Sequence, residues 1–489
     1  MSIDDGLGRI AKGEVFDDSW NRLVYSVDSS HYQIMPEMVV FPTDEEDVAK
    51  VCRYCSSKQL PIGARGSGTG LLGQSLTDGA VLDFTKHMNR IVEIEQDYVI
   101  VQPGVVKAVL DRELKKKGKF LPPDPASSNY CSVGGMVANN SSGIHCLGYG
   151  NTIDFLLGVS VVYADGSKGY AEEGRFDKKF AMLRDLLFPM LDIIHRRFPT
   201  VNKNSCGYRL DSVVQEDKFL PHKILAASEG SLGLLTEAKF RILDLPEHRC
   251  LLVLGFSDLL AAVSAAPVIL KFSPVALEMI DHTVVSSDRP GSGYGCILLV
   301  EFAGNRTLAD RQLESCAHEM KSRCSVTEYA SDESSLKRIW GARKGALNSI
   351  MKLTVGSRKP FGLIEDTVVQ PEDLPDHVGA LLKEYSRNKL EYVMYGHVGD
   401  GNLHTRPMVD LQSDAQMKMI EGIATRVFKR VVRRGGTITG EHGDGISRLP
   451  YIPMVYGRPI MKLFEQVKET FDPKYVLNPG KKIISRKLE

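Results

Sequence analysis

The hydrophobic and polar positions follow two different rhythms along the chain. In the first half, short apolar runs of strand length are separated by glycine-rich loops, and strands are expected at residues 38–42, 60–63 and 155–163. A helix is expected between the first two strands, because acidic residues open that segment and apolar residues then recur at helical spacing. The recurring apolar positions are Val48, Val51, Cys52 and Cys55.

From residue 246 onward, strand-like runs alternate with long helical intervals. Strands are expected at 251–256 and 296–302, with a helix from the first strand to residue 270 and another over 308–322. This β-α-β-β-α-β rhythm favours a ferredoxin-like second domain.

The same periodicities predict further elements. Helices are expected over 104–117, 332–352 and 415–434, and strands over 361–370 and 391–395. The first of these helices is expected to bury Val105, Val109 and Leu114. The last of these strands leads directly to His397.

Length and charge bound the class of protein. The chain has 489 residues, too many for a single core, so two or more domains are expected. Lys+Arg and Asp+Glu both number 61, so the net charge is zero and nucleic acid is not expected as a partner. The acidic N-terminus lacks the apolar segment of a signal peptide, and the most apolar window, residues 251–270, is interrupted by Gly255, Asp258 and Pro267. We therefore expect a cytoplasmic protein, or one peripheral to the inner face of a membrane.

The nine cysteines are scattered, and only Cys52 and Cys55 form a CxxC. No second pair follows, so the spacings of iron–sulfur and zinc-ribbon sites are absent. The odd count and the chain length favour a reducing compartment. The pair lies in a stretch of helical pattern, where packing accounts for it.

Two short glycine-rich loops near the C-terminus gather residues that can bind a metal. The first reads His397-Val-Gly-Asp-Gly-Asn-Leu-His404, and the second reads Gly440-Glu441-His442-Gly-Asp-Gly. Neutral imidazole and carboxylate are ligands for a borderline divalent metal such as zinc, and glycine lets the backbone turn sharply enough for these side chains to converge. Two turns with solvated histidines are the simpler alternative.

A third glycine-rich loop, residues 64–73, contains the pattern GxGxxG at Gly68, Gly70 and Gly73. A Rossmann fingerprint requires a helix directly afterwards, whereas a turn and a strand follow here. The loop can still bind phosphate through its backbone N–H groups. Small residues also dominate residues 132–143, so a large flat ligand could approach the backbone there.

In combination, these motifs resemble a known family. Pro61-Ile-Gly-Ala-Arg-Gly-Ser-Gly-Thr-Gly, Pro122-Pro-Asp-Pro, Val133-Gly-Gly-Met-Val-Ala-Asn-Asn and Ser228-Glu-Gly-Ser-Leu-Gly are similar to the FAD-binding domain of the vanillyl-alcohol-oxidase type. The two histidine loops and Asn478-Pro-Gly-Lys are similar to the FAD-linked oxidase C-terminal domain. The whole resembles the flavin D-2-hydroxyacid dehydrogenases, which include D-lactate dehydrogenases, the glycolate oxidase D subunit and D-2-hydroxyglutarate dehydrogenase.

The resemblance implies an α+β fold in which a vanillyl-alcohol-oxidase type FAD-binding domain is joined to a ferredoxin-like substrate (cap) domain. The expected parts are a lead-in over 1–34, the FAD-binding domain over 35–245, the substrate and metal domain over 246–460, and a segment over 461–489 that returns to the FAD-binding domain.

The resemblance also implies which residues bind FAD. They are Arg65, Gly66, Ser67, Gly68, Thr69, Gly73, Pro123, Ser132, Gly135, Asn139, Ser141, Gly143, Glu229, Gly230 and Asn478. Relatives with covalent FAD often carry a histidine in the first glycine loop. This chain has serine and glycine there, so non-covalent FAD is expected.

By the same resemblance, a divalent metal would be bound by His397, His404 and Glu441, with zinc expected first and manganese or iron as alternatives. His442 would be the catalytic base. A guanidinium binds a carboxylate through two hydrogen bonds, and an ammonium binds it as a point charge. The candidates for binding the substrate carboxylate are Arg343, Lys359 and Arg406.

The implied function is oxidation of a D-2-hydroxy acid to the 2-oxo acid, with hydride transfer to flavin N5 and electrons passed to a separate acceptor. D-lactate is favoured, because His404-Thr-Arg-Pro and residues 25–34 look like D-lactate dehydrogenases that are fused to iron–sulfur domains. D-2-hydroxyglutarate and glycolate are alternatives, and so is a non-catalytic FAD-binding subunit of a larger redox complex. The acceptor would be a quinone, an iron–sulfur subunit, an electron-transfer flavoprotein or a cytochrome, and a homodimer is left open.

Overall fold

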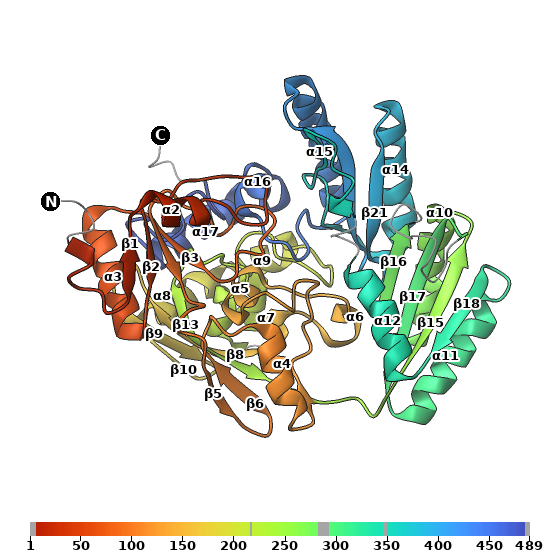
Figure 1. Cartoon of the computed structure of the whole chain (residues 1–489), viewed down its shortest axis with the longest axis horizontal. Coiled ribbons are helices and arrows are strands. Elements are labelled where there is room, and N and C mark those ends of the chain that lie inside the picture. Colours follow the sequence, from red (N-terminus) through yellow and green to blue (C-terminus); the bar gives the residue numbers. More distant parts are fainter. Residues whose placement is uncertain (1–5, 216–217, 282–292, 346–349, 485–489) are drawn as a thin grey trace.

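The computed structural model describes residues 6–215, 218–281, 293–345 and 350–484 (Figure 1). It is a mixed α+β structure, and its sheets fall into two groups, as the fold prediction requires. Residues 14–244 supply the sheets of the first group, and residues 248–410 supply the sheet of the second.

The first group begins with a four-stranded sheet in the order β1-β2-β4-β3. Its strands are β1 (Glu14–Phe16), β2 (Met38–Phe41), β3 (Ile62–Arg65) and β4 (Ala80–Asp83). The predicted helix forms as α3 (Glu45–Lys58), and its Asp44 cap accepts the N–H of Asp47. Cys52 and Cys55 are buried in this helix, and burial raises the pKa of the Cys55 thiol to about 12, which fits a packing role.

A six-stranded antiparallel sheet follows, in the order β10-β9-β8-β13-β6-β5. Its strands are β5 (Ile91–Ile94), β6 (Tyr98–Val101), β8 (Leu156–Val162), β9 (Lys168–Glu172), β10 (Arg175–Phe176) and β13 (Leu234–Arg241). Two short strand pairs, β7 (Lys119–Phe120) with β14 (Leu243–Asp244) and β11 (Val214–Gln215) with β12 (Lys218–Phe219), add to this region. Its helices are α2 (Ser19–Tyr25), α4 (Lys107–Lys115), α5 (Val133–Asn139), α6 (Cys146–Tyr149), α7 (Thr152–Phe155), α8 (Lys178–Leu187) and α9 (Leu191–Arg197).

The second group is an eight-stranded sheet whose first half confirms the ferredoxin-like prediction. Its elements run β15 (His248–Phe256), α10 (Leu259–Ile269), β16 (Ala276–Asp281), β17 (Cys296–Gly304), α11 (Arg306–Met320) and β18 (Ser325–Ala330). The strand order is β18-β15-β17-β16, with antiparallel neighbours throughout. Helix α12 (Glu333–Lys344) follows this half.

The second half of the sheet repeats this topology, which the sequence had not indicated. Its elements run β19 (Arg358–Pro360), β20 (Thr367–Val368), α14 (Leu374–Arg387), β21 (Tyr392–His397), β22 (Asn402–Asp410) and α15 (Asp414–Arg433). After α15 the chain returns to pair Thr437 with Val368 of β20. The two halves therefore meet where β16 pairs with β21, the strand that leads to His397.

The C-terminal elements return to the first group, beside the red N-terminal strands in Figure 1. After α16 (Gly445–Arg448) and α17 (Ile452–Phe471), the N–H of Ile62 donates to Val476 O at 2.7 Å, and the N–H of Asn478 donates to Ile62 O at 2.7 Å. A return of residues 461–489 to the FAD-binding domain was part of the expected division into domains. The exact division into domains stays a proposal.

Three local predictions were wrong. Val109 is 41% exposed, and its neighbour Leu110 is buried instead, because α4 starts only at Lys107 and shifts the buried face. Residues 361–370 do not form one strand, since the backbone turns into the left-handed region at Asp366. The helix predicted over 332–352 ends at Lys344 with Gly345 as its cap, and part of the predicted continuation lies outside the described residues.

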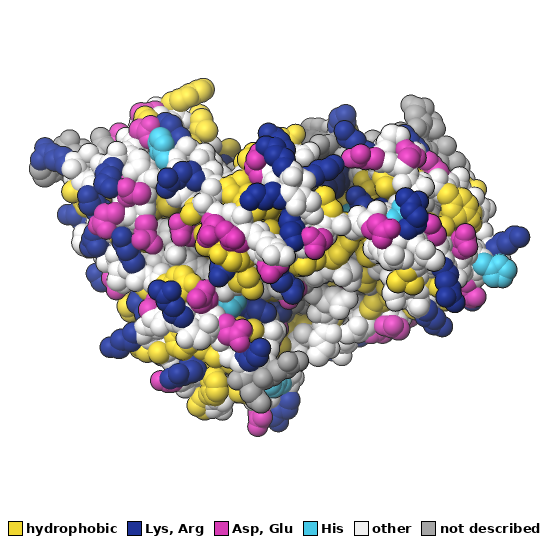
Figure 2. Space-filling view, turned by 90° about the horizontal axis from the view of Figure 1, so that it is seen from below, with side chains coloured by type: hydrophobic (Ala, Val, Ile, Leu, Met, Phe, Trp, Pro, Cys, Tyr) yellow, Lys and Arg dark blue, Asp and Glu magenta, His cyan; other side chains and the backbone are white. Residues whose placement is uncertain are grey.

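The surface agrees with the neutral charge balance. Basic and acidic side chains are interspersed over the face seen in Figure 2. Within the described ranges, no helix combines the length and the apolar character that crossing a membrane requires.

Candidate functional site

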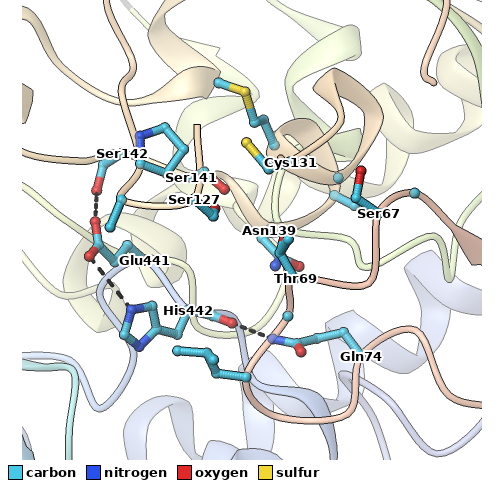
Figure 3. A pocket seen from close by; sticks show the side chains of 18 of the residues that line it. Ser67, Thr69, Gln74, Ser127, Cys131, Asn139, Ser141, Ser142, Glu441 and His442 are labelled. Atoms are coloured by element: carbon cyan, nitrogen blue, oxygen red, sulfur yellow. Dashed lines mark hydrogen bonds and ion pairs between the residues drawn. The ribbon is translucent and has the colours of Figure 1, made fainter. Parts of the chain in front are cut away.

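A pocket lies where the glycine-rich loop after β3, helix α5 and the two histidine loops meet (Figure 3). It contains about 1340 Å³ of space, a figure that includes the solvent at its open mouth. From the predicted FAD residues, its walls include Gly66, Ser67, Gly68, Thr69, Ser132, Gly135, Asn139, Ser141, Glu229 and Gly230. From the predicted substrate, metal and base residues, they include Arg343, His397, His404, Glu441 and His442.

The remaining predicted FAD residues do not line this pocket. Arg65 lines an adjoining cavity, while Gly73, Pro123, Gly143 and Asn478 are not among the described lining residues. Asn478 Nδ2 donates to the carbonyls of Gln74 and Glu229 at 2.9 and 2.6 Å, so it ties two pocket segments together.

Two observations fit a cofactor that carries phosphate. A Cβ at Gly66 would lie 1.9 Å from Ser132 Oγ, so any other residue would require the Ser132 side chain, at the start of α5, to shift. Arg65 Nη1 is buried without a hydrogen-bond partner, and a phosphate oxygen could accept from it. The residues present therefore fit FAD.

The predicted metal ligands converge around one oxygen. Glu441 Oε1 lies 2.9 Å from His397 Nε2, 3.2 Å from His404 Nε2 and 3.7 Å from His442 Nε2. Strands β21 and β22 place the first two histidines, since Tyr395 pairs with His404 and His397 lies two residues further on the same face. Burial lowers the pKa of His404 to about 4, which favours the neutral imidazole that binds a metal. The donor set of two imidazoles and a carboxylate fits a divalent ion.

The other oxygen of Glu441 contacts Ser142, Gly143 and Lys203. Its Oε2 accepts from Ser142 Oγ at 2.6 Å and from Gly143 N at 3.1 Å, and it lies 3.2 Å from Lys203 Nζ. Burial alone would raise the pKa of Glu441, but Lys203 and His397 hold it well below its usual value. Figure 3 shows the contact with Ser142 beside the one with His442.

Asp366 explains how adjacent residues Glu441 and His442 can both face the pocket. Its carboxylate accepts the backbone N–H groups of Gly440, Glu441 and His442 at 2.9, 3.1 and 2.9 Å. These contacts hold the loop in an open curve around the carboxylate. Asp366, His404, Glu441 and His442 each have one atom that could bind a metal, and these four atoms lie within 4.8 Å of one another.

His442 is oriented by a second buried carboxylate. Its Nδ1 lies 3.2 Å from Glu365 Oε1, and its ring stacks on that of His404 with centroids 4.6 Å apart. Gln74 Nε2 donates to the carbonyl of His442. Burial would lower the pKa of His442, but Asp366 and Glu365 raise it to about 9.

The three candidate substrate cations are in different places. Arg343 lines the pocket, and its Nε and Nη2 lie 2.9 and 2.6 Å from Glu278 Oε2. Arg406 lies behind the pocket, with Nη2 2.7 Å from Glu365 Oε2, and Lys359 is exposed on β19. Only Arg343 of the three is therefore placed at the pocket wall, together with its neighbour Lys344.

Sequence reasoning missed the buried charges behind these residues. They are Lys203, Glu278, Glu365 and Asp366, each less than 1% exposed. The sequence carries one signal for such residues, which is a charged residue inside an apolar, strand-like run. Charged residues are almost never buried unless they are paired, so such a position indicates a buried pair.

Comparison with known families decides the relationship. Residues 36–168 match the FAD binding domain, and residues 245–482 match the C-terminal domain of FAD linked oxidases. The chain is 31% identical to glycolate oxidase subunit GlcD of Bacillus subtilis, over 98% of this chain and 96% of that protein. This chain belongs to the FAD-linked oxidase family.

Another relative of this FAD-linked oxidase is the D-2-hydroxyglutarate dehydrogenase of Pseudomonas putida, 32% identical over 96% of this chain. The chain spans about half of that protein, 50% of its length. Among solved structures, 4-ethylphenol oxidase from Gulosibacter chungangensis has a TM-score of 0.71 at 16% identity, covering 100% of this chain and 97% of its own. That likeness confirms the vanillyl-alcohol-oxidase type fold.

Proposed function

We propose that this FAD-linked oxidase oxidises a D-2-hydroxy acid to the 2-oxo acid, and that D-lactate is its substrate. The observation that carries the proposal is the single pocket in which the FAD-type loops and the cluster of His397, His404 and Glu441 face each other. The names of the relatives support the substrate class. The site residues keep the roles that the resemblance gave them, as proposals.

When bound, FAD would accept the C2 hydride, and a divalent ion held by His397, His404 and Glu441 would polarise the substrate hydroxyl. His442 takes the hydroxyl proton at its Nε2, because its Nδ1 faces Glu365. Only the neutral ring can do this, and with a pKa of about 9 the neutral ring is the minority form at neutral pH. Arg343 binds the substrate carboxylate from the pocket wall. The base lies on one loop and the cation lies on α12, and both line the pocket, so the substrate can be held between them.

D-2-hydroxyglutarate is the second candidate substrate. Lys344 lines the pocket beside Arg343, and a second cation suits a substrate with two carboxylates. Its Nζ lies 3.6 Å from Asp124, so part of its charge is already balanced. D-lactate stays first, because it has one carboxylate and needs only one cation, whereas the charge of the second cation is partly balanced already.

Electrons must leave the reduced flavin for a separate acceptor, because the oxidation of one hydroxy acid yields two of them. A quinone, an iron–sulfur subunit, an electron-transfer flavoprotein or a cytochrome could take them. The alternative in which the protein is not an enzyme is a non-catalytic FAD-binding subunit. The intact cluster around Glu441 supports catalysis instead.

The test is dye reduction by the purified protein with D-lactate, L-lactate, D-2-hydroxyglutarate and glycolate, with and without a chelator. We expect the highest kcat/KM with D-lactate and loss of turnover once the metal has been removed. His442→Ala should abolish turnover while the flavin absorption stays. Equal rates with both lactate enantiomers, turnover that survives proven metal removal, or a protein with no flavin band would each contradict the proposal.

A further inference from the structure

Glu278, on β16, is a buried carboxylate that divides its two oxygens between two functional side chains. Its Oε1 lies 2.5 Å from His397 Nδ1, and its Oε2 lies 2.9 and 2.6 Å from Nε and Nη2 of Arg343. The side chain of Glu278 is 1% exposed. One carboxylate thus connects a residue of the metal cluster to the cation at the pocket wall.

The strand pairing makes this position possible. Strand β16 pairs with β21 at the junction of the two halves of the sheet, with Met279 opposite Gly396 and Ile280 opposite Tyr395. Glu278 therefore lies beside the end of β21, where His397 follows. Helix α12 brings Arg343 to the same carboxylate from another element. The three residues are far apart in sequence and meet only in the fold.

We propose that Glu278 is a positioning residue that orients both His397 toward a divalent ion and Arg343 toward the substrate carboxylate. This inference rests on the proposed function, because the ion and the substrate belong to it. A hydrogen bond at Nδ1 fixes the tautomer in which Nε2 is the metal-binding nitrogen, and it makes that nitrogen more basic. On the other side, Oε2 anchors two donors of the Arg343 guanidinium and so fixes the plane of the group.

A second glutamate in the site also contacts one histidine and one arginine, and this repetition supports a functional role for such glutamates. Arg406 and His442 share Glu365, as Arg343 and His397 share Glu278. His397 and His442 thus each have a buried glutamate behind them, and each glutamate has an arginine that balances its charge. A buried carboxylate with no compensating charge is strongly destabilising, which is why the arginines are needed.

The test compares Glu278→Gln with the wild type by titrating the metal-free, FAD-containing protein with zinc. Glutamine keeps the size of the side chain but removes its charge. We expect the dissociation constant for zinc to rise about 10- to 100-fold, since loss of such partners of ligating histidines has effects of that size. The flavin spectrum should stay unchanged.

Glu301→Gln is the matched control. Glu301 is also 1% exposed on the same sheet, and it lies between Arg249 and His145, but neither of these belongs to the metal cluster. Its zinc affinity should equal that of the wild type.

Kinetics give a second readout, through a cycle of Glu278→Gln, Arg343→Met and the double variant. If Glu278 acts on the substrate through Arg343, the rise in KM caused by Glu278→Gln should disappear when Arg343 is already absent. Additive effects on KM would contradict that half of the inference.

The outcomes separate this inference from the proposed function. If the wild type binds no zinc and turns over in chelator, the metal part of the proposed function fails. If the wild type binds zinc and Glu278→Gln binds it equally well, the proposed function stands and this inference is wrong. Should Glu278→Gln lose FAD, Glu278→Asp, which keeps the charge but shortens the reach, carries the test with the same two outcomes.

Discussion

His442 Nδ1 lies 3.2 Å from Glu365 Oε1, and Arg406 Nη2 lies 2.8 Å from the same oxygen. The proposed base is therefore held by a carboxylate whose charge Arg406 already balances. This leaves His442 Nε2 directed at Glu441 and the pocket, at 3.7 Å from Glu441 Oε1. The orientation of the base thus depends on a residue that does not line the pocket.

Glu365→Gln is expected to lower kcat by about 100-fold, at the lower end of what a general base contributes. The amide can keep one hydrogen bond to His442 but cannot stabilise the ring when it takes a proton. The measurement is steady-state dye reduction, with flavin absorption as the check on folding. A kcat within twofold or so of the wild type would show that Glu365 does not orient the base.

Arg343→Met is expected to raise KM by about 10- to 100-fold, because a hydrogen bond to a charged group is worth about 1.5–3 kcal/mol. Arg358→Met is the control, since Arg358 forms an exposed pair with Glu391 away from the pocket. The measurement is KM for the best substrate of the four tested. Equal KM values for the two variants would remove Arg343 from the substrate site.

Gly66→Ala is expected to weaken FAD binding by about 10- to 100-fold, because forcing an extra methyl group into a tight site costs about 1–3 kcal/mol. The new Cβ would lie 1.9 Å from Ser132 Oγ at the start of α5. Gly379→Ala is the control: Gly379 is in α14, and a Cβ there meets nothing within 4 Å. Flavin retained after gel filtration is the readout, and full retention by Gly66→Ala would contradict a close approach of loop and helix.

The pH dependence of stability is expected to reflect His145. Its Nδ1 lies 3.0 Å from Asp124 Oδ2 and its Nε2 lies 3.3 Å from Glu301 Oε1. Burial would lower the pKa of His145, but these two carboxylates raise it to about 10. A raised folded-state pKa stabilises the protein fully below the unfolded value of about 6.5, and this stabilisation is lost as the pH rises through the folded value.

The melting temperature should therefore fall as the pH rises from about 6.5 to about 10, and His145→Gln should make that fall shallower. Thermal unfolding followed by fluorescence at constant ionic strength measures both slopes. Parallel curves for the two proteins would mean that His145 is not charged in the folded state.

The periodic elements could be predicted because their patterns are local. The helix expected over 415–434 is α15 (Asp414–Arg433), and Ile420, Ile423, Val427 and Val431 form its buried face. The β-α-β-β-α-β rhythm likewise comes from strands and helices that are each defined by their own residues. The pocket loops were found for a related reason, since each motif is continuous in sequence.

The supporting carboxylates could not be found in that way, because their partners are remote. Glu278 is 119 residues from His397, and Glu365 is 77 residues from His442. In the sequence, each of these two glutamates lies in an apolar run. A single charged residue in such a run looks like a residue of a strand that faces the solvent. Asp366 shows the same difficulty: it lies at the left-handed turn that breaks the predicted strand, and its carboxylate accepts three N–H groups of the 440–442 loop.

The return of the C-terminus has a consequence for the order in which the protein is made. Asn478 joins Gln74 across 404 residues, and strand β3 takes its last hydrogen-bonded neighbour from residues 476–478. At a synthesis rate of about 5–20 residues per second, the glycine loop waits roughly 20–80 s for the segment that closes it. During that time the nascent chain exposes an open sheet edge and a pocket without one wall. The first region thus becomes a complete folding unit only after the second has been made.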